Sequence, residues 1–239
     1  MAKVVKDQEI ISIKPIKRVT TEITLIGDSP LIVHAWSEKA KKEMLAAQMK
    51  IAKAKKAKEP KNPVRDFFDS AYWICGKPEF DESWDERQAL DAINNALQNH
   101  GGKVGFPVTG IKQCAFMSVY RAGMVANTTG MKAAFKLLGT ENSEFATIEG
   151  VHSIAPTVDM REDMVKIGGI AKTADIRYRV QYSDWKMRLI IEHANTGTFS
   201  LGDIINAINY GGFASGIGEW RSERNGTFGA YHVAIGGED

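Results

Sequence analysis

The sequence predicts an α+β protein whose core follows the order β-α-β-β-α-β, the ferredoxin-like arrangement around an antiparallel sheet. Three observations predict it. Apolar and polar residues alternate, as in strands, at 16–26, 176–182 and 186–193. Apolar residues recur at helical spacing within 109–138 and 200–210, and a β-prone run at 227–235 comes last. Both helices would cover one face of the sheet and leave the other open.

The clearest strand signal is the pair 176–182 and 186–193. Ser183-Asp184 between them is composed like a turn. Folding the two runs as a hairpin about this turn would put Arg179 near Arg188 and Gln181 near Lys186. One sheet face would then be apolar. Its reverse would be basic and would carry the following residues: Arg177, Arg179, Lys186 and Arg188.

A lysine-rich helix is predicted within the first insertion into this core. Ser37 is a suitable N-cap for a helix that runs to about Lys58, with a narrow apolar seam and many lysines, among them Lys41, Lys42 and Lys53. Such lysines either form a solvated face or neutralise phosphates without reading bases. We expect a single domain over 1–239, with a helical insertion at 28–105 and a second insertion of strands and turns at 140–174.

A glycine-rich segment at 211–229 separates the last helix from the last strand. Glycine permits positive φ and close approach to the backbone. Trp220 offers a stacking plane, and Arg221 and Arg224 offer planar cationic donors. This combination indicates a loop that holds a phosphate-bearing polymer; the alternative is a glycine-rich hairpin with a packed tryptophan. Its glycines are Gly211, Gly212, Gly216, Gly218, Gly226 and Gly229.

Composition indicates a soluble globular protein with an uneven charge distribution. Residues 1–61 carry 14 Lys and Arg against 7 Asp and Glu, a net +7, while the remaining chain carries 17 against 22, a net −5. A basic segment suggests an anionic partner or the acidic face of another copy of the chain. No apolar run reaches membrane-spanning length, and two isolated cysteines suit a reducing, cytoplasmic setting.

These features resemble the RAMP superfamily, the repeat-associated proteins of CRISPR systems. The resemblance rests on a ferredoxin-like core with Gly216-Ile-Gly-Glu-Trp-Arg-Ser-Glu-Arg-Asn-Gly-Thr-Phe-Gly229 between its last helix and last strand. The chain is also similar to phage and prophage proteins with a Gly-Ile-Gly-x-Trp-Arg signature. The resemblance to the crRNA-coating backbone subunits implies an RNA ligand, oligomers along the strand, and a β-hairpin thumb at 140–174 that carries Met160, Arg161 and Met164. The lysine-rich helix has no counterpart in that family.

The fold is also RRM-like, but the aromatic pattern with which classical RNA-recognition domains stack bases is absent from these strands. His34 is the candidate for catalysis, because RAMP processing endoribonucleases often use a histidine near this position as a general base. It lies in the apolar stretch Leu31-Ile-Val-His-Ala-Trp36, where a lone histidine is more often a packed residue that makes one hydrogen bond. No pair of histidines or cysteines has metal-ligand spacing, and no cofactor fingerprint is present, so we expect neither metal nor cofactor.

The sequence therefore favours a non-enzymatic protein that binds single-stranded RNA or DNA and forms homo-oligomers along the strand. Phosphate contacts would come from the basic sheet face, the glycine-rich segment and the lysine-rich helix, giving strongly salt-dependent binding. Two alternatives remain open. One is a metal-independent endoribonuclease that uses His34, and the other is a phage structural or assembly protein that uses its basic surfaces for self-assembly.

Overall fold

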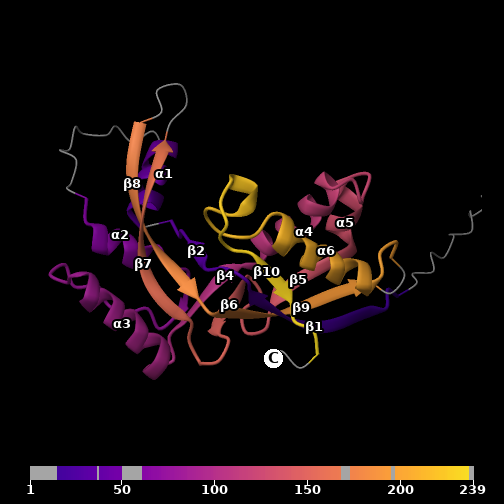
Figure 1. The fold of residues 1–239 in the computed structure, drawn as a ribbon, viewed down its shortest axis with the longest axis horizontal. Helices are drawn as coiled ribbons and strands as arrows, with labels where there is room; N and C mark the ends of the chain where they lie inside the picture. The colour runs from indigo at the N-terminus through magenta and orange to yellow at the C-terminus, as the bar shows by residue number, and fades with distance from the viewer. Residues whose placement is uncertain (1–14, 37, 50–60, 168–172, 195–196, 237–239) are drawn as a thin grey trace, which may run out of the picture.

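The computed structural model describes residues 15–36, 38–49, 61–167, 173–194 and 197–236. They form a mixed α+β structure with two antiparallel sheets. The larger sheet has the strand order β10-β1-β9-β6-β4-β3, with β5 also paired to β9, and the smaller has the order β2-β8-β7. In Figure 1 the helices α4 (Val108–Arg121), α5 (Thr128–Ala134) and α6 (Leu201–Ala214) lie together on one side of the larger sheet.

Two long strands form the centre of the larger sheet. β1 (Arg18–Gly27) pairs with β9 (Trp185–Ala194) along its length, and near its end it pairs with β10 (Tyr231–Val233). Alternate residues of β9 are buried from Trp185 to His193, which is the strand pattern expected from the sequence. The other edge of β9 pairs with β5 (Phe135–Gly139) and β6 (Phe145–Gly150).

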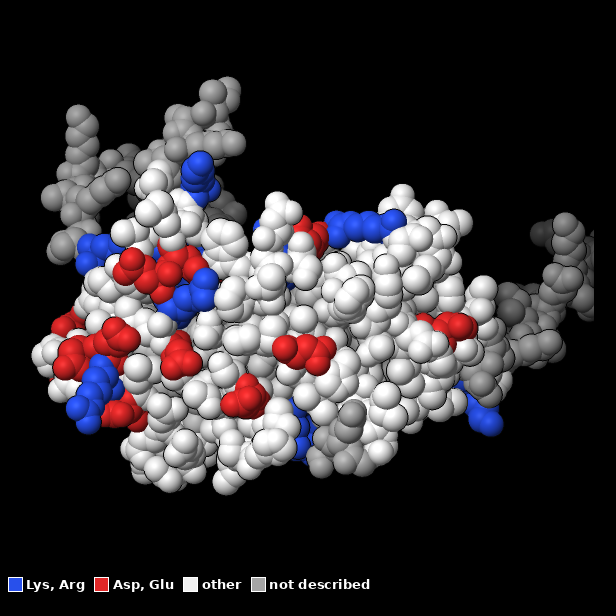
Figure 2. Space-filling model, viewed as in Figure 1, with Lys and Arg blue, Asp and Glu red and all other residues white. Residues whose placement is uncertain are grey.

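The sheet continues through β4 (Lys103–Pro107) to β3 (Trp73–Cys75). α2 (Pro63–Asp69) and α3 (Glu86–Asn99) lie on the side of the molecule away from α4–α6 (Figure 1). α3 is capped by Asp85 and Gln88 in a reciprocal capping box. Figure 2 shows acidic side chains concentrated over this region.

The smaller sheet is a long hairpin with a short third strand. β7 (Thr157–Ile167) and β8 (Thr173–Ser183) pair over eleven positions, and β2 (Leu31–Val33) pairs with β8 from Leu31↔Tyr182 to Val33↔Val180. The hairpin projects from the body in Figure 1, beside α1 (Glu38–Gln48). The expected hairpin within 140–174 is therefore only partly right, because its second arm is β8.

The predicted hairpin between 176–182 and 186–193 is wrong. β8 and β9 belong to different sheets, and the chain turns between them at Asp184, which has φ 52°. Trp185 then enters the core with an exposed fraction of 1%. The indole covers Gly27 and donates to the carbonyl of Ser29 at 2.9 Å, so burial of this ring separates the two strands. No continuous basic sheet face results.

Three other boundaries also differ from prediction. Two helical pieces were expected within 109–138. The first is α4, whereas the run from Met131 to Leu138 is the end of α5 followed by β5, in which Phe135 and Leu137 are buried. The last strand is shorter than 227–235. Gly211 and Gly212 lie inside α6 instead of ending it: a Cβ on Gly211 would be 3.1 Å from the backbone of Ala115. Small residues here let α4 and α6 pack closely.

Candidate functional site

The candidate site lies where three distant parts of the chain meet. These are the end of β2, the β7–β8 hairpin and the segment 215–230, which we call the glycine-rich loop. Figure 1 shows this loop, in yellow, between the hairpin and the helices α4 and α6. A cavity of about 240 Å³ opens beside it. Part of its lining comes from His34, Tyr72, Phe106, Gln113, Glu219 and Arg221.

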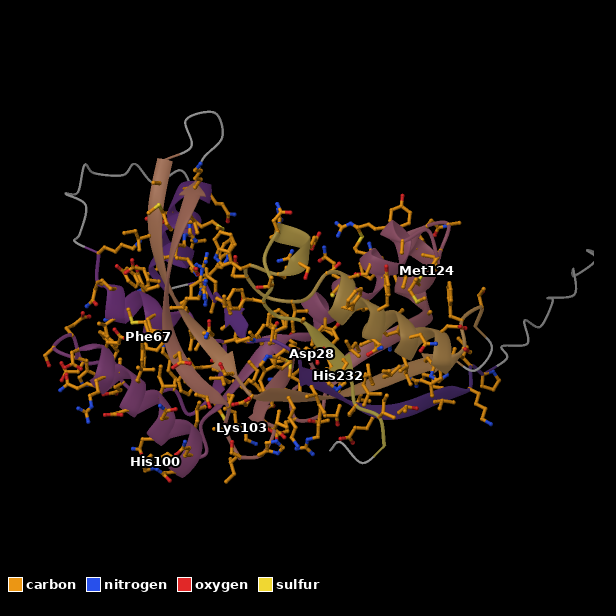
Figure 3. All side chains as sticks on the ribbon, in the orientation of Figure 1. Asp28, Phe67, His100, Lys103, Met124 and His232 are labelled. Atoms are coloured by element: carbon orange, nitrogen blue, oxygen red, sulfur yellow. The ribbon has the colours of Figure 1, made fainter. Side chains whose placement is uncertain are left out.

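Backbone hydrogen bonds hold the glycine-rich loop against β2. The amide of Glu219 donates to Ile32 O and that of Gly229 to Pro30 O, both at 2.9 Å. Gly218 has φ +75°, and a Cβ there would lie 2.3 Å from Ile32 O. Glycine is thus required for this close approach, and the loop has a defined conformation. Next to it, His232 and Asp28 join β10 to the first turn, with 2.6 Å between Nδ1 and Oδ1 (Figure 3).

The loop side chains that we predicted to bind a ligand differ in whether other residues of the protein already hold them. Arg221 is occupied within the loop, since its Nε donates to Glu223 at 2.9 Å and its Nη1 to Gly218 O at 2.8 Å. Arg224, at the end of the turn η1 (Ser222–Arg224), is exposed, and no side-chain partner for it exists among the described residues. Trp220 is half-buried at φ 50°, and its Nε1 is buried without a hydrogen-bond partner in the described part of the chain.

An arginine cluster from the hairpin lies on the other side of His34. Arg179 is 4% exposed, and its Nη1 donates to Asp163 at 3.2 Å. Arg161 also donates to Asp163, at 2.8 Å, and its guanidinium lies 4.4 Å from the ring centroid of Phe228 in the glycine-rich loop. These contacts fasten the loop to the hairpin. The sequence placed Arg179 on an open face, whereas it is buried, bonded to Asp163 and His34, and has Glu219 of the loop 3.7 Å away.

His34 lies between two guanidinium groups. Arg179 Nε donates to Nδ1 at 3.2 Å, and Arg177 Nη1 is 3.3 Å from Nε2. Burial, followed by the charges of Arg179 and Arg177, lowers the pKa of His34 to about 4. The imidazole is therefore neutral at pH 7, well away from the pKa near the working pH that suits a general base. On the opposite side, Tyr72 donates its hydroxyl proton to His34 O at 3.2 Å.

Other predicted cations lie apart from this cluster. Arg188 is on β9, exposed, and bonded to Glu149 at 2.8 Å. Lys186 lies on the same strand, half-buried, and both line a second cavity of about 550 Å³ near Lys103. Lys103 is labelled in Figure 3, at the edge of the molecule opposite the hairpin tip. This placement corrects the predicted single basic face, because strand pairing puts Arg179 and Arg188 in separate sheets.

The lysine-rich helix is observed only in part. α1 covers Glu38–Gln48, with Lys41 and Lys42 exposed, and Lys53 lies outside the described residues. In the hairpin, Met160 is half-buried and Met164 is 73% exposed near the tip. The thumb residues thus occupy different environments: Arg161 joins the His34 cluster, and Met164 faces solvent.

Sequence reasoning missed four residues of the site: Tyr72, Gln113, Asp163 and Glu219. Asp163 is 5% exposed and holds two arginines, but in the sequence it is one acid among several in a charged strand. Glu219 lies 3.7 Å from Arg179 Nη2. Only Glu219 had a usable signal, its position inside the glycine-rich motif.

The described residues contain no cluster of three or more candidate metal ligands. Over the same residues, no helix is long and apolar enough to cross a membrane. No protein-family model matches the chain, and no curated protein matches it.

Proposed function

We propose that this protein binds single-stranded nucleic acid along the seam between the β7–β8 hairpin and the glycine-rich loop, without cleaving it. The observation that carries the proposal is the meeting of the hairpin arginines with the glycine-rich loop. Arg161 and Arg177 are half-buried, and the loop adds the exposed Arg224. Buried Arg179 holds His34 and Asp163 in place. Guanidinium groups bind phosphate through paired donors. The seam brings together β2, β7, β8 and the glycine-rich loop.

The strand order supports the same proposal. Taken with their connections, β1, α4, β5, β9, α6 and β10 follow the order β-α-β-β-α-β, and the strands lie in the order β10-β1-β9-β5. We propose that this is a ferredoxin-like core of RAMP type, in which β5 takes the place that we predicted for 176–182. The β7–β8 hairpin then lies between β5 and β9, the second and third strands of that core, whereas the resemblance placed the thumb between the first helix and the second strand.

Self-association along the strand is part of the proposal. Large apolar side chains are exposed on and near α1 and at the hairpin: Trp36, Met44, Leu45, Met49, Met164 and Ile176. Exposed apolar groups of this kind suit contact with a neighbouring copy. Sedimentation velocity with and without a strand of about 40 nucleotides tests this; we expect larger species only with the strand. Equal oligomers after nuclease treatment would instead favour the structural or assembly role.

Fluorescence anisotropy with labelled single-stranded RNA and DNA tests binding itself. We expect tight binding at low salt and a steep loss of affinity as the salt concentration rises. A plot of the logarithm of the binding constant against the logarithm of salt concentration should have a slope of about −0.7 for each neutralised phosphate. Arg177→Gln and Arg224→Ala should each weaken binding and make this slope shallower by about 0.7, whereas the matched control Arg87→Gln, an exposed arginine on α3, should not. Absence of binding at low salt refutes the proposal.

The same samples test the endoribonuclease alternative. Labelled RNA incubated with protein and a chelator should remain intact on a denaturing gel. Cleavage that disappears in His34→Ala would replace our proposal with a nuclease. The neutral, arginine-flanked imidazole of His34 favours a binding role over proton transfer.

A further inference from the structure

The cluster around His34 contains one hydrogen-bond donor too many. A neutral imidazole has one N–H and one nitrogen lone pair. Both ring nitrogens nevertheless face guanidinium N–H groups, Arg179 Nε on Nδ1 and Arg177 Nη1 on Nε2. If Nδ1 accepts from Arg179, the proton lies on Nε2, opposite the donor of Arg177. The alternative tautomer moves the same conflict to Arg179.

An acceptor placed near either nitrogen would resolve this conflict. Two donors that point at one place form a site for an oxygen, and an anionic oxygen is favoured where both neighbours are arginines. Within the part of the chain that the structure describes, no carboxylate fills this position. Asp175 accepts from Arg177 Nε at 3.3 Å and Asp163 accepts from Arg179, while Glu219 is 3.7 Å from Arg179 Nη2 and leaves Arg177 Nη1 to the histidine.

The cavity beside His34 has the chemistry of a site for a planar polar ring. Its volume of about 240 Å³ is below the ~300–1,000 Å³ of sites for drug-sized ligands, so it suits a smaller unit. The aromatic side chains Tyr72 and Phe106 contribute to its lining. Glu223, also in the lining, is neutralised by Arg121 at 2.6 Å and Arg221 at 2.9 Å, so it brings no net charge to the cavity.

Gln113 supplies the polar group that is free to recognise such a ring. It is exposed on α4, lines the cavity, and has no hydrogen-bond partner among the residues that the structure describes. A carboxamide offers a donor and an acceptor side by side, which matches the edge of a base. Ser215, by contrast, is already bonded to Ser118 at 2.6 Å.

We propose that this place binds one nucleotide unit, with a phosphate oxygen between His34 and Arg177 and an unstacked base in the cavity beside Gln113. This inference specifies one binding site within the proposed function. It rests on that function when the bound nucleotide is part of a strand. Glu219, with its side chain 44% exposed and its charge toward Arg179, competes with the phosphate. It therefore weakens binding.

Oligonucleotides with a single 2-aminopurine, a base analogue that fluoresces when unstacked, test the inference. We expect a several-fold rise in fluorescence on binding. Gln113→Trp, which fills the cavity from an exposed position, should abolish the rise and weaken binding about tenfold. Gln98→Trp, a matched change at an exposed glutamine on α3, should alter neither. Glu219→Gln should strengthen binding several-fold at equal salt, an effect that misfolding does not produce.

Calorimetric titration with adenosine and cytidine monophosphates and with inorganic phosphate separates the possible sources of the unit. Strand binding with unchanged 2-aminopurine fluorescence and no effect of Gln113→Trp overturns the inference and leaves the proposed function standing. Mononucleotide binding that Gln113→Trp removes, without strand binding, supports the site and overturns the proposed function. Phosphate binding as tight as that of both nucleotides overturns the base site, and absence of all binding overturns both.

Discussion

Replacing Asp163 with asparagine should destabilise the protein strongly although the side chain keeps its shape. Asp163 is 5% exposed and accepts from Arg161 Nε at 2.8 Å and from Arg179 Nη1 at 3.2 Å. Asparagine retains one acceptor oxygen and turns the other into a donor that faces a guanidinium. Arg179, which is 4% exposed, would then be left with a neutral histidine and a carboxylate 3.7 Å away.

Breaking a buried ion pair from one side costs roughly 3–5 kcal/mol. Because Glu219 remains near Arg179, we expect Asp163→Asn to lower the free energy of unfolding by about 3 kcal/mol, at the lower end of that range. For a chain of this size, about 1 kcal/mol corresponds to about 2–4 °C, so the melting temperature should fall by about 6–12 °C.

Urea unfolding followed by circular dichroism at pH 7.5 measures this change. Asp159→Asn is the matched control, because Asp159 lies on the same strand, is exposed, and makes no ion pair among the described residues. Its effect should be under about 0.5 kcal/mol. If the two variants are equally stable, the hairpin arginines are not held by Asp163, and our account of the cluster is wrong.

Three further predictions concern other parts of the molecule. His34 has a pKa of about 4 in the folded protein against 6.5 ordinarily, so the unfolded chain takes up its proton first: stability should fall by about 1–2 kcal/mol as the pH drops from 6.5 to 4. His34→Gln should flatten that part of the profile of unfolding free energy against pH, and parallel profiles would contradict this. Gly212→Ala should lower the melting temperature markedly, because its Cβ would lie 1.9 Å from a backbone oxygen of β10, whereas Gly236→Ala, in open space, should not; equal melting temperatures would refute the packing. Burial raises the pKa of the Cys114 thiol to about 11, so a thiol reagent at pH 8 should label the exposed Cys75 alone until denaturant is added, and labelling of both without denaturant would oppose this.

Local patterns predicted which segments are strands and helices better than which strands are neighbours. The alternation in 186–193 and the helical spacing of apolar residues in 200–210 are local signals, and the structure contains β9 and α6 where they predicted a strand and a helix. Pairing depends on distant residues instead. Phe135–Gly139 is a strand because it lies against β9, although it continues a helix-like run in the sequence. Tertiary contacts override local preference at such positions.

The candidate site was predicted at the level of residue types but not of their contacts. The glycine-rich loop, His34 and the hairpin arginines were all singled out, yet nothing local indicated that they meet. Their meeting follows from the pairing of β2 with β8, at Ile32↔Gln181 among other positions. The exposure of Arg179 was misjudged for the same reason, since alternation along a strand says nothing about which loop covers it.

The pairing of β1 and β2 with the far end of the chain has a consequence for biosynthesis. Among the described residues, β1 pairs only with β9 and β10, for example at Leu25↔Met187 and Leu25↔Val233, and β2 pairs only with β8. β2 therefore stays unpaired until β8 has been translated, although its residues Leu31, Ile32 and Val33 are 0–1% exposed in the folded protein. Proteins with non-local strand pairing of this kind fold slowly, and their unpaired apolar strands are exposed to aggregation in the meantime. A ribosome-bound chain that stops before β10 should be captured by chaperones, and extension of the chain through β10 should complete the fold and the seam together.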